Sequence, residues 1–226
     1  MPFPFRAVLF DFDGTLADSY DAITASVNHV RTHRELEPLH EREVRTLVGH
    51  GLLQLMADVV PGSDPEANAA LYREHHPSVM FELTRLLPDV LDVLQQLHAQ
   101  GVRLGVCSNK PVAITRKLIA ALAIDAYIPL DAAFGPEDAQ NPKPDPGMAF
   151  AAMKRLGVSV GETLFVGDMT IDIHTARAAG VNVWVLPTGS SDLHVLQHAG
   201  PDRIMLRMAE MLEANNEPRP SGSGSF

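Results

Sequence analysis

The sequence predicts an α/β fold in which a Rossmann-like parallel sheet carries helices on both faces and an all-helical domain is inserted after the first strand. Three observations lead to this prediction. Short runs that are apolar on both faces recur along the chain, as the buried strands of a parallel sheet require. Amphipathic helical segments that end at glycines separate these runs. One long interval after the first run holds helical patterns and no convincing strand.

Four apolar runs are the predicted strands, and the first of them leads directly into a polar segment. The runs are residues 7–10, 102–107, 163–166 and 181–186. Helical periodicity links them: Val90, Leu94 and Leu97 share one helix face, and Gly101 stops that helix before the second run. In such sheets the crossovers are right-handed, and ligands bind outside the carboxyl ends of the strands.

The interval between the first two runs predicts the inserted helical domain, which we call the cap. Three amphipathic stretches, separated by proline-containing breaks, are expected to be its helices: residues 21–34, 41–60 and 66–86. We therefore expect a cap at 17–86, a core made of 1–16 and 87–214, and linkers near 15–18 and 83–89. The tail, 215–226, is poor in apolar residues and rich in Pro, Gly and Ser, so it is expected to be disordered.

Composition limits the partners and the setting of the protein. The 226 residues include 18 Lys and Arg against 28 Asp and Glu, a formal charge of −10, so the overall field repels nucleic acid and anionic membranes. A single cysteine excludes an internal disulfide and fits a reducing compartment. No signal-peptide pattern is present, and no run approaches the roughly 20 apolar residues of a membrane span. We expect a soluble, cytoplasmic protein that binds neither nucleic acid nor membranes.

Two pairs of carboxylates follow predicted strands. Asp11 and Asp13 lie two apart after the first strand, and residues two apart in an extended segment point the same way. Asp168 and Asp172 lie four apart on one face at the start of a helix. A turn explains the first pair alone, and helix capping explains either member of the second. Neither explains why two strands each deliver a pair of acids, the ligand type that a hard cation such as Mg²⁺ prefers.

Hydroxyl, amide and lysine groups follow other predicted elements. Thr15 adds a hydroxyl after the first acidic pair, and Ser108 and Asn109 lie where the run at 102–107 gives way to a helix. These groups suit a phosphate oxygen, although Ser or Asn before a helix is also a common N-cap. Lys143 lies between prolines that restrain its loop, so it could bind phosphate and keep nearby carboxylates ionised. The alternatives are a solvated loop lysine, or Lys110 in the phosphate-binding role.

Taken in order, these segments resemble the four motifs of the haloacid dehalogenase superfamily. The matching segments are Asp11-Phe-Asp-Gly-Thr-Leu-Ala-Asp-Ser19, Ser108-Asn109, Lys143-Pro144 and Gly167-Asp-Met-Thr-Ile-Asp172. The resemblance covers roughly residues 6–213, and an ordered four-part match is specific. The helical insertion is similar to the C1 cap of the phosphoglycolate phosphatase-like branch. Two further segments are similar to that branch, Val44–Leu53 in the cap and Thr188-Gly189-Ser190 after the last strand.

The resemblance implies a two-step phosphoryl transfer from a small phosphorylated metabolite. Asp11 would attack phosphorus, and Asp13 would protonate the leaving oxygen and then activate water. Mg²⁺ would be held by the Asp11 carboxylate, the backbone carbonyl of Asp13 and Asp168, with Asp172 binding directly or through water. The expected phosphate-binding residues are Thr15, Ser108, Asn109 and Lys143. The metal and Lys143 would supply the positive charge with which an acidic protein binds an anionic substrate.

Several alternatives are weighed against a phosphatase. Asp13 argues against a dehalogenase or a phosphonatase, because both lack an acid at this position. A phosphomutase uses the same acids and stays open, since only the cap distinguishes it. A receiver-type phospho-accepting domain also uses acids, Thr and Lys, but its nucleophile is not on the first strand and a cap has no use there. The physiological substrate and the choice between monomer and homodimer also stay open.

His50, between Gly49 and Gly51 in the cap, is the remaining candidate for substrate binding. A cap that opens to admit substrate and closes to exclude water would bring this residue to the site. The alternative is a histidine at the junction of two helices.

Overall fold

The computed structural model describes residues 3–213, so the predicted tail at 215–226 lies outside the described residues. The strands are β1 (Ala7–Phe10), β2 (Ala17–Asp18), β3 (Arg85–Leu86), β4 (Arg103–Cys107), β5 (Ala133–Phe134), β6 (Thr163–Gly167), β7 (Asn182–Val185) and β8 (Arg203–Ile204). The α-helices are α1 (Tyr20–His33), α2 (Glu41–Arg45), α3 (Leu52–Val59), α4 (Pro65–His75), α5 (Met80–Leu83), α6 (Val90–Ala99), α7 (Val112–Ala121), α8 (Gly147–Leu156), α9 (Thr170–Ala179), α10 (Leu193–Ala199) and α11 (Glu210–Glu213). Short 3₁₀ turns are η1 (His76–Ser78), η2 (Leu130–Ala132), η3 (Pro136–Asp138) and η4 (Val160–Glu162).

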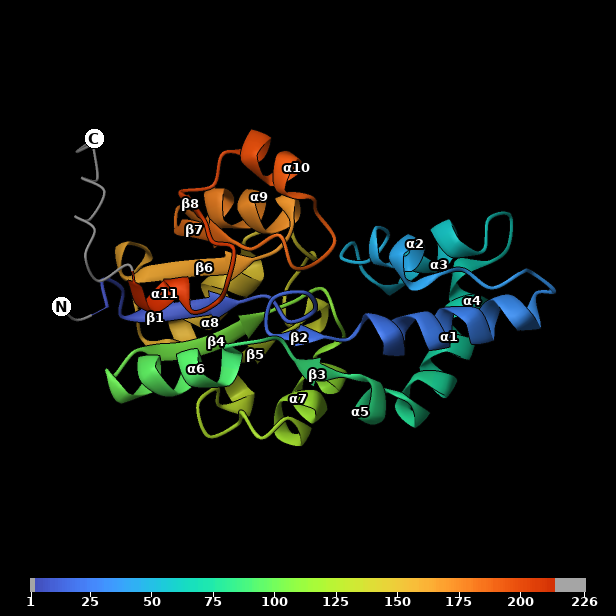
Figure 1. The fold of residues 1–226 in the computed structure, drawn as a ribbon, viewed down its shortest axis with the longest axis horizontal. Helices are drawn as coiled ribbons and strands as arrows, with labels where there is room; N and C mark the ends of the chain where they lie inside the picture. Colours follow the sequence, from blue (N-terminus) through green and yellow to red (C-terminus); the bar gives the residue numbers. More distant parts are fainter. Residues whose placement is uncertain (1–2, 214–226) are drawn as a thin grey trace.

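A parallel sheet with strand order β5-β4-β1-β6-β7-β8 forms the centre of the larger part of the molecule (Figure 1). Strand β1 lies between β4 and β6, and Phe10 pairs with Val106 on one side and Val166 on the other. Helices α6, α7 and α11 pack on one face of the sheet, and α8, α9 and α10 pack on the other. The predicted α/β class is therefore confirmed. Because the strands are parallel, the carboxyl ends of the neighbours β1, β4 and β6 lie side by side at one end of the strands, which we call the carboxyl edge of the sheet.

The four predicted strands are all present, with bounds that differ by one residue at most at each end. Strands β5 and β8 were not predicted. Each has two residues, too few for any periodicity to distinguish a strand from a loop. They pair with β4 and β7 and so widen the sheet at both edges.

Helices α1 to α5 and the turn η1 form a separate layer beside the sheet, which we call the helical layer (Figure 1). It has its own apolar cluster, which includes Val27, Val44 and Met56. The helix expected over 41–60 is wrong in its middle, because α2 ends at Arg45 and α3 begins at Leu52. Gly49 and Gly51 between them have φ values of 122° and 92°, which a helix does not accommodate.

The chain crosses between the sheet and the helical layer twice, and the two crossings pair with each other. Ala17 lies opposite Leu86 and Asp18 opposite Arg85 in the antiparallel strands β2 and β3. The expectation that 17–86 holds no convincing strand was therefore wrong. The helical stretch expected over 66–86 was wrong at its end, because α5 ends at Leu83 and Arg85–Leu86 form β3. These strands lie in the spans expected to be linkers, and the division into a core and a cap stays a prediction.

Candidate active site

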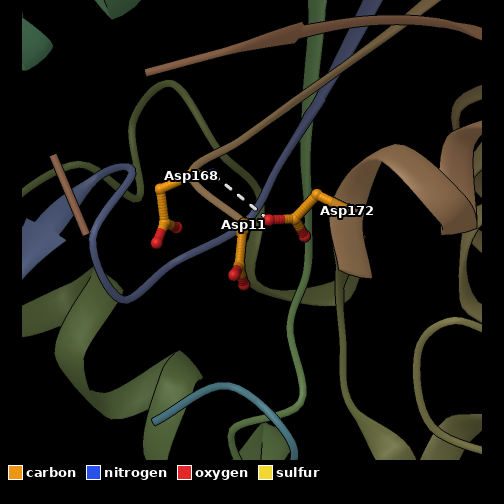
Figure 2. Close-up of side chains that lie close together, drawn as sticks. All are labelled: Asp11, Asp168 and Asp172. Carbon is orange, nitrogen blue, oxygen red and sulfur yellow. Dashed lines mark hydrogen bonds between the residues drawn. The ribbon is translucent and has the colours of Figure 1, made fainter. Parts of the chain in front are cut away.

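Three buried carboxylates meet at the carboxyl edge of the sheet. Oxygen atoms of Asp11, Asp168 and Asp172 lie within 4.8 Å of one another. Figure 2 shows the three side chains converging from the segments after β1 and β6 and from the first turn of α9. The sequence pairs Asp11 with Asp13 and Asp168 with Asp172. The structure instead groups one member of the first pair with both members of the second, which we call the acidic cluster.

Asp172 acts both as a helix cap and as a member of the acidic cluster. Its Oδ2 accepts hydrogen bonds from the backbone N–H groups of Asp168 at 3.2 Å and Met169 at 3.0 Å, at the start of α9. Its Oδ1 accepts a hydrogen bond from Nζ of Lys143 at 2.7 Å. The capping interpretation and the functional one therefore hold together, with one oxygen used for each.

Asp168 is fully buried and is held by donors from two other segments. Thr15 Oγ1 donates to its Oδ1 at 2.9 Å, and the backbone N–H of Ser190 donates to its Oδ2 at 3.0 Å. Gly189 makes this approach possible, because a Cβ at that position would lie 1.8 Å from Asp168 Oδ2. Gly14 has a φ of 80°, and a Cβ there would lie 2.7 Å from the same oxygen. The carboxylate therefore depends on two glycines far apart in the sequence.

Gly189→Ala is expected to lower the melting temperature by roughly 2–10 °C. The added methyl group forces Asp168 or the 188–190 backbone to move, at a cost of about 1–3 kcal/mol. Differential scanning calorimetry measures the shift. The matched control is Gly161→Ala, because a Cβ there meets nothing within 4 Å. Equal melting temperatures for the two variants would contradict the close approach to Asp168.

Lys143 connects Asp11 to Asp172 and is itself fixed by Asn109. Its Nζ lies 3.0 Å from Asp11 Oδ2 and 2.7 Å from Asp172 Oδ1, and its side chain is 1% exposed. The Asn109 side chain accepts a hydrogen bond from the Lys143 N–H at 2.8 Å and donates one to the Lys143 carbonyl at 3.2 Å. The same amide donates to the carbonyl of Gly49 in the helical layer at 2.9 Å. Asn109 therefore holds the backbone of the lysine loop on one side and the helical layer on the other.

The electrostatics of the acidic cluster fit a divalent cation. Burial raises the pKa of Asp11 to about 6, against the attraction of Lys143 and with repulsion from Asp172. Burial first, and then the charges of Asp172 and Asp11, hold the pKa of Asp168 well above its usual value. Burial lowers the pKa of Lys143, but the attraction of Asp11 and Asp172 outweighs it, so the pKa is raised and the group stays charged. The acidic cluster therefore has three carboxyl groups and only one ammonium group, that of Lys143, beside it. Oxygen ligands with excess negative charge are what Mg²⁺ prefers, so these residues fit the metal.

A second buried ion pair lies beside the acidic cluster. Nζ of Lys110 lies 3.1 Å from Oδ1 and 3.3 Å from Oδ2 of Asp13, and Ser19 Oγ donates to the same carboxylate. The Lys110 side chain is 6% exposed. Sequence reasoning leaves Lys110 and Lys143 as alternatives for one role, but Lys110 contacts Asp13 whereas Lys143 contacts Asp11 and Asp172. It missed Ser19, although this residue lies at the end of the first motif.

A cavity of about 100 Å³ lies between the sheet edge and the helical layer. Most polar side chains of its wall come from the core, namely Asp11, Asp13, Ser108, Asn109, Lys110 and Ser190, while Arg73 and His76 come from the helical layer. Most of the apolar side chains come from the helical layer, among them Ile23, Val48, Leu52 and Leu55. Two further contacts hold the helical layer over the core. Arg45 Nη1 donates to the Thr188 carbonyl at 3.2 Å, and the Tyr20 hydroxyl lies 3.1 Å from Ser190 Oγ.

Most of the predicted site residues come together, and one does not. Those that line the cavity are Asp11, Asp13, Ser108 and Asn109. Four others, Thr15, Lys143, Asp168 and Asp172, lie behind the cavity wall without lining it. Lys143 contacts both Asp11 and Asp172, and Thr15 contacts Asp168. His50 is exposed and is not part of the cavity wall, where its neighbours Gly49 and Gly51 lie. The Thr15 hydroxyl donates its hydrogen to Asp168. Contacts of Thr15 and of His50 with a phosphate group therefore stay predictions.

Comparison with known proteins identifies the class to which this fold and site belong. The family model for haloacid dehalogenase-like hydrolases matches residues 8–186. A structure described as a predicted phosphoglycolate phosphatase from Haemophilus somnus aligns with a TM-score of 0.84 at 27% identity, over 94% of this chain and 98% of that one. A structure described as a putative haloacid dehalogenase-like hydrolase from Bacteroides fragilis aligns with a TM-score of 0.85 at 28% identity, over 92% of this chain and 99% of that one. The chain belongs to the haloacid dehalogenase-like hydrolase family, as its four motifs predict.

Curated relatives define the branch within this family. The phosphoglycolate phosphatase of Rhodospirillum rubrum is 36% identical over 197 residues, which cover 82% of this chain and 81% of the relative. The phosphoglycolate phosphatase of Escherichia coli K12 is 31% identical over 97% of this chain and 96% of the relative. This chain is accordingly an enzyme, a phosphatase of the family. Within residues 3–213, no helix is both long and apolar enough to cross a membrane.

Proposed function

We propose that this enzyme is a Mg²⁺-dependent phosphomonoester phosphatase that forms a phosphoryl-aspartate on Asp11. The observation that carries the proposal is the position of Asp11, which lines the cavity and also belongs to the acidic cluster. A carboxylate in this position can reach a phosphoryl group in the cavity while the cluster neutralises charge behind it. The names of the relatives make 2-phosphoglycolate the first candidate substrate.

The residues that would hold Mg²⁺ are the carboxylates of Asp11 and Asp168 and the backbone carbonyl of Asp13, with Asp172 binding directly or through water. When bound, Mg²⁺ supplies positive charge that offsets the charges of the phosphoryl oxygens and of the acidic cluster. Thr15 and the Ser190 N–H orient the Asp168 carboxylate for this role.

Protein groups carry each bond change of the proposed reaction. A carboxylate oxygen of Asp11 attacks phosphorus, the bond from phosphorus to the ester oxygen breaks, and Asp13 gives a proton to that oxygen so that an alcohol leaves. Asp13 then takes a proton from water, whose oxygen attacks phosphorus and releases inorganic phosphate and the Asp11 carboxylate. Ser108 and Lys143 hold the phosphoryl oxygens. Lys110, which is paired with Asp13, would lie beside the leaving oxygen that Asp13 protonates.

The test is phosphate release from a panel of phosphomonoesters that begins with 2-phosphoglycolate and includes sugar phosphates and nucleotides. Repeated turnover with Mg²⁺ that stops in EDTA is the expected result. A phosphomutase would convert one phosphate ester into another with little free phosphate, and a receiver-type domain would take up one phosphoryl group from acetyl phosphate and hold it. Either result, with a folded protein, would overturn the proposal.

Magnesium is expected to raise the melting temperature more at about pH 7.5 than at about pH 5. Without metal, the folded protein keeps a proton on Asp11 up to its raised pKa of about 6, whereas the unfolded chain loses it near the ordinary value of 3.8. The folded state therefore loses stability as pH rises through this window, and a bound cation restores it. Thermal unfolding with MgCl₂ and with EDTA at both pH values measures this. A larger magnesium effect at the lower pH would contradict the charge argument.

We also propose the setting of the reaction. The substrates are small phosphorylated metabolites rather than nucleic acids or membrane lipids, since the chain carries a formal charge of −10 and the cavity is small. The cytoplasm fits the single free cysteine, Cys107, which is buried at the end of β4. Size-exclusion chromatography with light scattering distinguishes a monomer from a homodimer.

A further inference from the structure

A buried ammonium group in the cavity wall has a single carboxylate partner. Lys110 lines the cavity together with Asp13, and its side chain is 6% exposed. Its Nζ lies 3.1 Å from Oδ1 and 3.3 Å from Oδ2 of Asp13, which are the only acceptors that it contacts among the described residues. An ammonium group carries three N–H donors. At least one donor of Lys110 is therefore left for a further acceptor.

Lys143 shows how this site surrounds a buried ammonium group that is fully paired. Its Nζ lies between two carboxylates, 3.0 Å from Asp11 Oδ2 and 2.7 Å from Asp172 Oδ1. Lys110 is almost as buried but has one carboxylate, and that carboxylate also accepts a hydrogen bond from Ser19. A buried charge needs partners and hydrogen bonds to offset its loss of water. Lys110 therefore has room for a second anionic partner, on the side of the cavity.

The rest of the cavity wall offers an anionic group few other partners. Within the described part of the chain, the only other Lys or Arg of the wall is Arg73, whose side chain is 54% exposed and lies 3.7 Å from Glu66. The helical layer contributes mainly apolar side chains, such as Val48 and Leu55. Opposite charges attract more strongly in such apolar surroundings than at an exposed surface. An anionic group in the cavity is therefore attracted mainly to Lys110.

The ion pair with Asp13 places Lys110 close to the ester oxygen of the substrate. In the proposed reaction Asp13 gives a proton to that oxygen, so the two groups come within about 3 Å of each other. Because Nζ lies 3.1 Å from Asp13, it lies at most about 6 Å from the ester oxygen. A carboxylate on the carbon that bears the ester oxygen has its own oxygens about 3 Å from that oxygen. One of them can therefore reach Nζ while the ester oxygen stays hydrogen-bonded to Asp13.

We propose that Lys110 is a specificity residue whose ammonium group bridges Asp13 and a carboxylate of the leaving group, so that the enzyme selects phosphomonoesters with a carboxylate on the ester carbon. The inference rests on the proposed phosphatase function, since the leaving group is defined by the bond that Asp11 breaks. 2-Phosphoglycolate carries its carboxylate at the required position, whereas alkyl phosphates carry none. Lys143 would hold the phosphoryl end of the substrate, and Lys110 would hold the other end.

An ester without the carboxylate loses the contact and leaves a donor of Lys110 unpaired in the filled cavity. Sites that present a buried charged group discriminate strongly against an analogue that lacks the matching group. Ethyl phosphate is such an analogue, because a methyl group replaces the carboxylate of 2-phosphoglycolate. We expect kcat/KM of the wild-type enzyme for 2-phosphoglycolate to exceed that for ethyl phosphate by at least about thirtyfold.

The experiment measures phosphate release from these two esters with Mg²⁺ and compares the ratio of their kcat/KM values between enzymes. Lys110→Met removes the charge and leaves Asp13 without its cation, so both esters are expected to react more slowly. The carboxylated ester is expected to lose more, so that the ratio falls by at least about tenfold. Lys110→Arg restores a cation and is expected to recover part of the ratio. The intrinsic reactivities of the two esters cancel when the ratios are compared.

Arg73→Met is the matched control, because Arg73 lines the same cavity but is largely exposed. Exposed charges are screened by water and contribute little, so this variant is expected to change the ratio by less than about threefold. Thermal unfolding of each variant shows which of them are folded.

Three results would overturn the role of Lys110. A wild-type ratio close to one does so without any variant. An unchanged ratio in folded Lys110→Met, with both esters slowed equally, reduces Lys110 to a partner of Asp13. Loss of the ratio in Arg73→Met but not in Lys110→Met assigns the carboxylate to the helical layer. Failure of the phosphatase proposal has a different signature, because the wild type then releases phosphate from neither ester and from no other member of the panel.

Discussion

Asp11→Asn is expected to reduce phosphate release by at least about a thousandfold while making the metal-free protein more stable. The amide has nearly the same shape but cannot attack phosphorus, so the covalent route is lost. Burial raises the pKa of Asp11 to about 6, so its charge at neutral pH costs folding free energy that the neutral amide does not. Phosphate-release assays and thermal unfolding in EDTA measure the two effects on one preparation.

The opposite directions of these effects separate chemistry from misfolding. Asp18→Asn is the matched control, because Asp18 belongs to the same motif but its side chain is 47% exposed and lies 3.7 Å from Arg45 in a surface ion pair. Such pairs contribute little, so activity and melting temperature are expected to stay near wild type. Retention of more than about a tenth of the activity in Asp11→Asn would rule out Asp11 as the nucleophile.

Lys143→Met is expected to destabilise the protein by about 3–5 kcal/mol and to abolish phosphate release. Methionine fills similar space but leaves the carboxylates of Asp11 and Asp172 buried without their cation. Removal of one partner of a buried ion pair is more costly than replacement of the whole pair, because the remaining charge has no compensation. Urea unfolding gives the free energy, and added Mg²⁺ is expected to restore part of it.

The control for this prediction is Lys117→Met, which changes an exposed lysine on α7. Its expected effect on the free energy of unfolding is within about 0.5 kcal/mol. If both variants unfolded at the same urea concentration, Lys143 would contribute no more than a surface lysine, and the acidic cluster would have to be neutralised in another way.

Sequence reasoning predicts the site well where chemistry lies at the end of a predicted strand. Asp11, Ser108 and Asp168 follow apolar runs whose strands prove to be neighbours, and parallel strands place their carboxyl ends at one edge. It predicts Lys143 from its loop and the family pattern, and the structure places this lysine on Asp11. The local pattern is enough to predict these residues, because each is placed by the single strand or loop that carries it.

Other features depend on contacts between segments, which periodicity does not contain. Gly189 matters only because β7 lies beside β6 and brings its loop against Asp168. In the 49–51 segment, the sequence favours His50 because of its residue type. In the structure His50 is exposed, and the group that contacts the site is the Gly49 carbonyl, which accepts a hydrogen bond from Asn109.

The side chain of Asn109 has a consequence for the order of events in one turnover. It bonds to the helical layer at Gly49 and to both backbone groups of Lys143, so a closed layer helps to fix the loop that carries the lysine. If the layer opens during turnover, as the inserted helical domain predicts, that loop would lose one of its restraints, and Lys143 in its proposed role would hold inorganic phosphate less tightly. Phosphate is therefore expected to leave after opening rather than before it, and the rate of such an opening would set an upper limit on kcat.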